Sequence, residues 1–434
     1  MKKGFKIALA LLVVAAFVCI GVTSCSNKPK PSKVTIWCWD PNFNGYSMKA
    51  AEAVYVKTHP EVTFDIVDIP NDQIEPKIEA ALQANGAGLP DIALVQDFSI
   101  EKFLQNYPKA FADLKAAGID YSKFAPYKVG PMTVGKSIYG IPFDTGSTGL
   151  WLRADYIKKA GLKPEDYQKP MTWAQVIKLG EIVKAKTGKP LFAYESDSFD
   201  TLRIMVQSSG GQFFNDKGEL DINSDAVKKS LVILKELNDK GLLFMAEGWS
   251  NWVNALNNDQ SAGFLDAIWM VGTVKSKPEN KGKWMVVPTP LLEGVPGAAN
   301  ASNNGGSSWF VFDKAANKKV AIDFLKSVWA SDSPDSLAFY NDILKACGAM
   351  GTFLPSQSQP NYTAQDDFFY GNQAVFKDFS SWMAKVPTLK YTANYNSMRT
   401  AVYNATLLFF QGKYKTVDET LAAASKEYKQ TTGQ

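Results

Sequence analysis

The alternation of short β-rich runs with amphipathic helical runs constrains the fold of this 434-residue chain more than any other feature. Residues 34–37, 62–67 and 91–95 have the composition of strands, and apolar residues at helical spacing fill 46–58 and 71–84 between them. The third run is continuously apolar, as in a parallel strand that is covered on both faces. This strand–helix–strand order predicts an α/β fold.

The second half of the chain continues the mixed pattern and is too long for one core. Two extended segments are expected at 138–143 and 149–152, and Thr172 with Gln175 forms a capping-box pattern that opens a helix. Further helices are predicted at 223–240 and 318–329. Since a chain of this length exceeds what one hydrophobic core usually holds, two domains are expected.

The N-terminal segment has the layout of an export signal. Lys2, Lys3 and Lys6 precede an apolar run over 7–22, and small residues lead to Cys25. The sequence around the cut resembles a bacterial lipoprotein signal, which implies removal of 1–24, acylation of Cys25 and a polar tether over 25–33. We therefore expect an exported protein, anchored by lipid to the cell membrane and facing the periplasm or the cell exterior.

Composition argues against several classes of function. Removing the three lysines of the signal lowers the formal net charge from +4 to +1, so the chain offers no basic stripe for nucleic acid. The chain contains one histidine and no cysteine cluster, so neither a metal site nor a cofactor is expected. Cys38 and Cys347 are either joined in one disulfide or are two free thiols.

Seven short motifs occur in the order found in one family. Together they resemble the extracellular sugar-binding proteins of ATP-binding-cassette importers, the family that includes maltose-binding protein. Each motif is weak alone, but the series covers nearly the whole chain after the signal. The motifs lie at 34–40, 89–92, 139–143, 150–155, 171–173, 262–269 and 305–309.

The resemblance implies a periplasmic-binding-protein-like fold, with two lobes joined by a multi-strand hinge and a ligand cleft between them. Lobe 1 is expected over 34–143 and 288–340, and lobe 2 over 144–287 and 341–434. The chain would then cross between lobes near 143–145, near Pro288 and within 334–345. The same resemblance implies a monomer that docks on the transmembrane permease of the importer.

Carboxylates and aromatic rings gather where the predicted strands end, and both suit a sugar. An indole can cover the apolar face of a pyranose, and a carboxylate accepts hydrogen bonds from hydroxyl groups. Trp249 would add a stacking surface, Gly306 would let the backbone approach a ligand, and Tyr395 and Arg399 match a region that often reaches the cleft in the family. The candidate ligand-binding residues are Trp39, Asp40, Asp97, Phe98, Asp144, Trp249, Asp266, Trp269, Gly306, Trp309, Tyr395 and Arg399.

Several of these residues also have a purely structural interpretation. Asp144 could serve only as a hinge hydrogen-bonder, and Asp266 could cap the helix that Trp269 enters. Asp91 is interpreted as structural. Five other tryptophans are expected to pack in the cores, namely Trp151, Trp173, Trp284, Trp329 and Trp382.

The function predicted from these features is capture of a neutral mono- or oligosaccharide by lobe closure, followed by delivery to the importer, without catalysis. A secreted glycoside hydrolase would use similar residues, with paired carboxylates across a glycosidic bond. A surface adhesin without a small ligand is a third alternative. Within the binding class, polyols and polyamines remain open as ligands.

Overall fold

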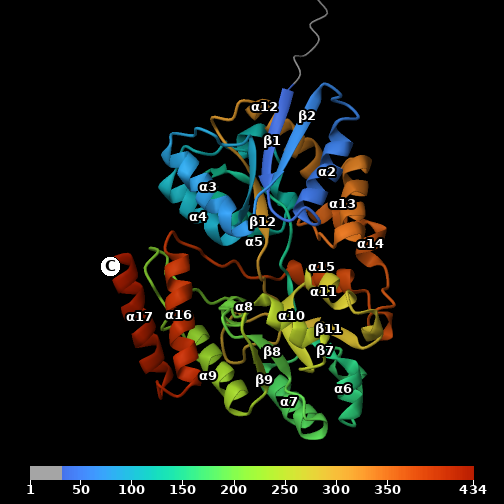
Figure 1. Cartoon of the computed structure of the whole chain (residues 1–434), viewed down its shortest axis with the longest axis vertical. Helices are drawn as coiled ribbons and strands as arrows, with labels where there is room; N and C mark the ends of the chain where they lie inside the picture. Colours follow the sequence, from blue (N-terminus) through green and yellow to red (C-terminus); the bar gives the residue numbers. More distant parts are fainter. Residues whose placement is uncertain (1–31) are drawn as a thin grey trace, which may run out of the picture.

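The computed structural model describes residues 32–434, which form an upper and a lower α/β lobe (Figure 1). The segments predicted at 62–67 and 91–95 are strands β2 and β3, and the predicted helix at 71–84 is α3. The upper lobe contains β1 (Ser32–Cys38), α2 (Asn44–Tyr55), β2 (Val62–Asp68), α3 (Asn71–Gln83), β3 (Ile92–Gln96), α4 (Asp97–Asn106), α5 (Pro126–Val129), β4 (Thr133–Val134), β5 (Ser137–Ile138), β6 (Gly140–Pro142), β12 (Ser307–Val311), α12 (Lys318–Phe324) and α13 (Pro334–Cys347).

The upper sheet has the strand order β2-β1-β3-β12-β6. Strand β1 is parallel to β2 and to β3, as the sequence predicts, whereas β12 is antiparallel to β3. The reason is topological: β3 ends beside the lower lobe, while β12 enters the upper lobe from there and runs the other way (Figure 1). The carboxyl end of β3 and the start of β12 therefore meet at the junction between the lobes, where Ser307 pairs with Gln96.

The lower lobe combines an antiparallel sheet, β10-β7-β11, with a parallel pair, β8-β9. Helix α7 begins at the predicted capping box, in which Thr172 and Gln175 exchange hydrogen bonds. The lower lobe contains β7 (Thr148–Arg153), α6 (Ala154–Lys159), α7 (Trp173–Thr187), β8 (Phe192–Glu195), α8 (Asp200–Ser208), α9 (Asp225–Asp239), β9 (Leu243–Ala246), α10 (Trp249–Asn257), β10 (Gly263–Ala267), α11 (Met270–Lys275), β11 (Trp284–Pro288), α15 (Val375–Met383), α16 (Tyr395–Phe410) and α17 (Val417–Thr432).

Three chain segments lie side by side between the lobes. The Asn304 amide donates to the Gly146 carbonyl (2.7 Å), and the Thr145 amide donates to the Met350 carbonyl (3.0 Å). The predicted crossings at Pro288 and within 334–345 are wrong, because Pro288 pairs with Gly149 in the lower sheet and α13 packs against α2 in the upper lobe. We propose crossings at 143–147, 302–307 and 349–353 instead.

The five tryptophans expected to pack in the cores are all buried. Asp91 is structural as expected, since its carboxylate accepts hydrogen bonds from the backbone amides of Thr35 and Asn317. Cys38 and Cys347 are free thiols, not a disulfide. Among residues 32–434, no helix is both long enough and apolar enough to cross a membrane.

Candidate ligand-binding cleft

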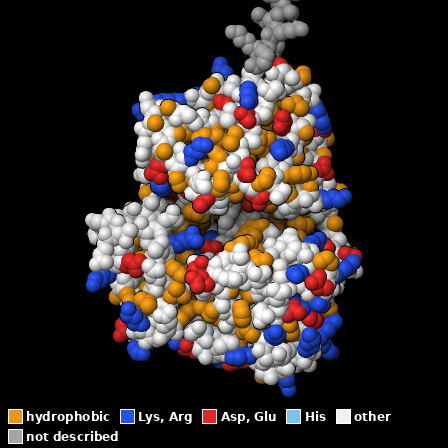
Figure 2. Space-filling view, in the orientation of Figure 1, with side chains coloured by type: hydrophobic (Ala, Val, Ile, Leu, Met, Phe, Trp, Pro, Cys, Tyr) orange, Lys and Arg blue, Asp and Glu red, His pale blue; other side chains and the backbone are white. Residues whose placement is uncertain are grey.

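A cleft of about 880 Å³ lies between the two lobes. The space-filling view shows the molecule hollowed along this junction (Figure 2). Helix α3 and the start of α4 form the upper lip, and the loop after β8 together with α16 forms the lower lip. Of the predicted ligand-binding residues, Phe98 and Arg399 line this space, one from each lobe.

An aromatic surface continues from the lower lip at the start of α10. The Trp249 side chain is 47% exposed, and its ring lies 5.5 Å from the Trp269 ring and 5.2 Å from the Trp252 ring, centroid to centroid. The Gly248 amide, directly before α10, donates to the Asp197 carboxylate (2.7 Å), and Asp197 lines the cleft. The indoles of Trp249 and Trp269 thus form a partly exposed apolar surface next to the cleft.

Asp266 lies at the end of β10, beside these indoles. Its Oδ1 accepts hydrogen bonds from the Asn304 side-chain amide (2.8 Å) and from the Ala267 backbone amide (2.6 Å). Trp269 Nε1 donates to the Asn304 carbonyl (3.3 Å), so one hinge residue positions both groups. The alternative that Asp266 caps the following helix is wrong, because α11 begins without a side-chain cap.

Burial raises the pKa of two carboxyl groups on this face of the lower lobe. The pKa of Asp266 is raised to about 8, chiefly by burial and further by the nearby charges of Asp200 and Glu195, while the Asn304 hydrogen bond opposes the shift. The pKa of Glu195 is raised to about 7, again first by burial and then by Asp200 and Asp197. Both groups therefore hold protons over part of the neutral range, and a protonated carboxyl can donate as well as accept a hydrogen bond.

Arg203 of α8 ties this face to the hinge. Its guanidinium donates to the Asn303 carbonyl (2.8 Å) and to the Asn304 side-chain oxygen, and it pairs with Asp200 (3.4 Å). Only about 5% of Arg203 is exposed. The fork of the guanidinium thus fixes the orientation of Asn304, which in turn holds Asp266.

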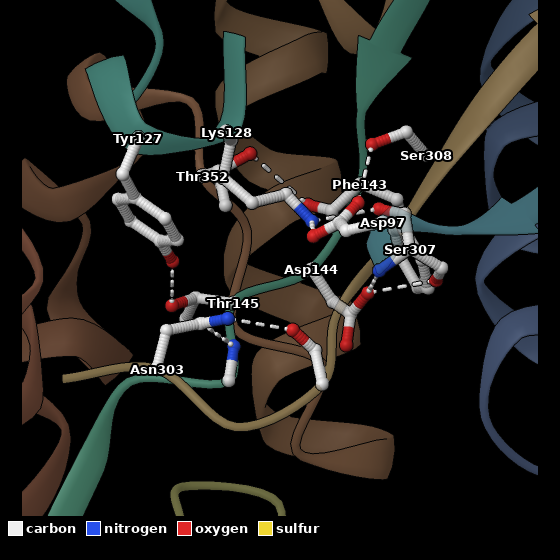
Figure 3. Close-up of polar contacts among 12 residues, drawn as sticks. Asp97, Tyr127, Lys128, Phe143, Asp144, Thr145, Asn303, Ser307, Ser308 and Thr352 are labelled. Atoms are coloured by element: carbon white, nitrogen blue, oxygen red, sulfur yellow. Dashed lines mark hydrogen bonds and ion pairs between the residues drawn. The ribbon is translucent and has the colours of Figure 1, made fainter. Parts of the chain in front are cut away.

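Asp97 and Asp144 are bound inside the protein at the top of the hinge (Figure 3). Asp97 forms a buried ion pair with Lys128 of α5 and accepts from the Ser308 hydroxyl (3.1 Å). Asp144 accepts hydrogen bonds from the backbone amide (2.8 Å) and hydroxyl (2.9 Å) of Ser307. Both carboxylates hold β12 to neighbouring segments. For Asp144 this is the structural alternative given above, in which it forms hydrogen bonds within the hinge.

Gly306 is required by this packing rather than by a ligand. Its backbone has φ of +98°, and a Cβ atom there would lie 2.8 Å from both the Asp97 carboxylate and the Lys128 ammonium. The close approach expected at Gly306 therefore exists, but its partners are protein side chains.

The remaining candidates differ in their accessibility. Trp309 is fully buried in the upper core, which corrects the expectation that it lines the cleft: its side chain points to the sheet face opposite that of its neighbour Ser308. Tyr395 is also buried, with its ring centroid 6.2 Å from that of Phe98 across the lobes and its hydroxyl unpaired. Trp39 is half-buried, packing against the upper core, and Asp40 is exposed in a left-handed turn before α2.

Five residues of the cleft and hinge were missed by the sequence analysis: Glu75, Lys128, Asp197, Arg203 and Asn304. The scarcity of arginine was a usable signal for Arg203, since only three occur in the chain. Nothing in the local sequence distinguishes Lys128 or Glu75 from an exposed charge. Among residues 32–434, no group of histidine, cysteine or acidic side chains is arranged to hold a metal ion.

Comparison with known proteins identifies the family. The profile described as bacterial extracellular solute-binding protein matches residues 40–331, so this chain belongs to that family. A lactose-binding protein of Rhizobium radiobacter is 41% identical over 391 residues, which cover 90% of this chain and 91% of that protein. An arabinooligosaccharide-binding protein of Bacillus subtilis (strain 168) is 27% identical, with 75% of this chain and 76% of that protein covered.

Solved structures agree on the fold. A crystal structure of an extracellular solute-binding protein of family 1 matches with a TM-score of 0.77 and 21% identity, covering 92% of this chain and all of that one. The two-lobed α/β prediction is therefore confirmed, as is membership of the predicted family. The family is extracellular, which implies export, and the relatives named above are binding proteins, not enzymes.

Proposed function

We propose that this protein captures a neutral disaccharide or short oligosaccharide, with a lactose-type galactoside as the leading candidate, and delivers it to the permease of an ATP-binding-cassette importer. The observation that carries the proposal is the 41% identity to a lactose-binding protein across nine-tenths of the chain. The sugar-binding relative from Bacillus subtilis supports the same ligand class. The mechanism is lobe closure, in which a ligand that contacts both lobes shifts the population toward the closed form.

The chemistry of the cleft supports this ligand class. The Trp249 and Trp269 indoles offer apolar area for the C–H face of a pyranose, and Asp266 lies beside them as a hydrogen-bonding partner for hydroxyl groups. Asp197, Phe98 and Arg399 are among the residues that line the adjoining cleft. We assign these six residues as the ligand-contacting set, and we assign Asp97, Asp144 and Gly306 to the hinge.

The test is isothermal titration calorimetry of the mature domain, from Ser26 onward, with lactose, maltose, arabino-oligosaccharides, sn-glycerol 3-phosphate, a polyol and a polyamine. Saturable binding of lactose or another neutral saccharide supports the proposal. Binding of only the phosphate, polyol or polyamine would move the ligand to another class, and no binding at all would favour an adhesin. Release of galactose from lactose would instead indicate a hydrolase.

Replacing Trp249 with alanine is expected to weaken sugar binding by about ten- to a hundredfold, because the 47% exposed Trp249 indole is lost as a stacking surface for the sugar. Calorimetry with the sugar found above measures the change. Tyr46→Ala is the matched control, since this aromatic residue is 42% exposed on α2, outside the cleft. Equal affinity of Trp249→Ala and the wild type would remove Trp249 from the site.

We also propose that the chain is a lipoprotein acylated at Cys25, with 25–33 as its tether. These residues lie outside the part of the chain that the structure describes. A Cys25→Ser variant is expected to lose metabolic labelling by palmitate and to leave the membrane fraction. Cys38→Ser and Cys347→Ser, which alter the two free thiols of the folded domain, should keep the label. Labelled Cys25→Ser protein would contradict the assignment.

A further inference from the structure

Two opposite charges face the cleft from different lobes without a full set of partners. Glu75 of α3 accepts a hydrogen bond from the Ser99 hydroxyl through Oε2 (2.7 Å), but its Oε1 is buried and has no hydrogen-bond partner. Arg399 of α16 makes no hydrogen bond or ion pair with any residue in 32–434, although it is one of only three arginines in the chain. A buried carboxylate oxygen without a partner is costly, and burial raises the pKa of Glu75, so a cation that reaches this group would stabilise its charged form.

The other charges at the cleft do not satisfy these two groups. Lys102, the cation on the same lip as Glu75, already pairs with Glu79 at 2.7 Å. On the lower lip, Asp197 accepts a hydrogen bond from the Gly248 amide, and Glu195 lies near Arg399 with a pKa raised chiefly by burial. Asp72 adds a further negative charge to the upper lip. The upper lip therefore carries an excess of carboxylates, and these line the same cleft as the arginine of the lower lip.

We propose that Arg399 and Glu75 form an ion pair across the cleft when the lobes close, and that this clasp slows release of the bound sugar. A guanidinium can reach a carboxylate with two parallel hydrogen bonds, which would satisfy Glu75 Oε1 only in the closed form. The effect on release rests on the proposed function, because it requires a bound sugar, whereas the ion pair itself requires only that the two lobes approach each other. The clasp gives Arg399 a role in closure in addition to its place in the lining of the cleft.

The test is a double-mutant cycle on the sugar dissociation rate, measured by stopped-flow fluorescence. Glu75→Gln and Arg399→Gln are each expected to speed release by about three- to tenfold. The double variant should be no faster than either single one, and the charge swap Glu75→Arg with Arg399→Glu should restore slow release. Asp335→Asn is the control, since it breaks an exposed ion pair with Lys57 within the upper lobe, away from the cleft. Two results would overturn the clasp: additive effects of the two substitutions on the dissociation rate, or faster release with Arg399→Gln but not with Glu75→Gln.

A second readout does not depend on the identity of the sugar. Small-angle X-ray scattering of the ligand-free protein should give a larger radius of gyration for Arg399→Glu, because like charges then face each other, and the charge swap should return the wild-type value. If the wild type binds no sugar but the scattering changes as expected, the clasp stands and the proposed ligand falls. If sugar binds but neither scattering nor release responds, the clasp falls and the proposed function stands.

Discussion

Replacing Lys128 with methionine is expected to lower the free energy of unfolding by about 3–5 kcal/mol. The Lys128 side chain is fully buried, and its ammonium pairs with Asp97 and donates to the Ser307 carbonyl at 3.0 Å. Methionine keeps the apolar stem but leaves the Asp97 carboxylate buried without its counter-charge. Urea denaturation followed by tryptophan fluorescence measures the change, and Lys318→Met, which breaks an exposed ion pair with Asp313, is the control that should leave the midpoint nearly unchanged.

The destabilisation by Lys128→Met should shrink as the pH falls. Burial raises the pKa of Asp97, and the Lys128 ammonium opposes that shift. In the variant the opposing charge is gone, so the folded state binds a proton at Asp97 that the unfolded state releases, and stability falls as pH rises above the unfolded pKa. We therefore expect a smaller loss at pH 5 than at pH 8. An equal loss at both pH values would show that the Asp97 charge is not the cause.

Local sequence patterns predicted the elements of this fold because each pattern depends on near neighbours. The alternation VTFDIV marks β2, and the helical spacing of Ile74 and Ile78 marks α3, whose buried residues are those two. The capping box at Thr172 was readable for the same reason. Two of the predicted lobe boundaries were wrong because they depend on long-range packing. Helix α13 packs in the upper lobe and Pro288 pairs in the lower one, and no local pattern carries that information.

The candidate site was harder to predict, because a residue at the end of a strand can face a ligand or another segment of the protein. Asp97 follows β3 as expected, but Lys128 and Ser308 arrive from distant parts of the chain and occupy its oxygens. Trp309 was assigned to the cleft from its motif, although strand alternation directs it into the core. Trp249, Trp269 and Asp266 could be selected because each combines a suitable side chain with a loop or an element terminus.

Replacing Gly146 with alanine is expected to destabilise the protein by about 3 kcal/mol or more, or to prevent folding. Gly146 lies where two crossing segments touch, and its carbonyl accepts from the Asn304 amide while its own amide donates to the Asn303 side chain (3.0 Å). A Cβ atom at Gly146 would lie 1.9 Å from the Asn304 carbonyl oxygen, far inside any contact that real Cβ atoms make. The neighbour is backbone, so no rotamer change can relieve the clash.

The same substitution should also disturb the site, because Asn304 holds both Asp266 and Trp269. Any folded Gly146→Ala protein is therefore expected to bind sugar more weakly than the wild type, measured by calorimetry alongside urea denaturation. Gly272→Ala is the matched control: this glycine lies inside α11 with open space around its Cβ position, and alanine is the better helix former there. A Gly146→Ala protein of wild-type stability and affinity would mean that the two crossings can separate freely, and that the hinge does not set the geometry of the cleft.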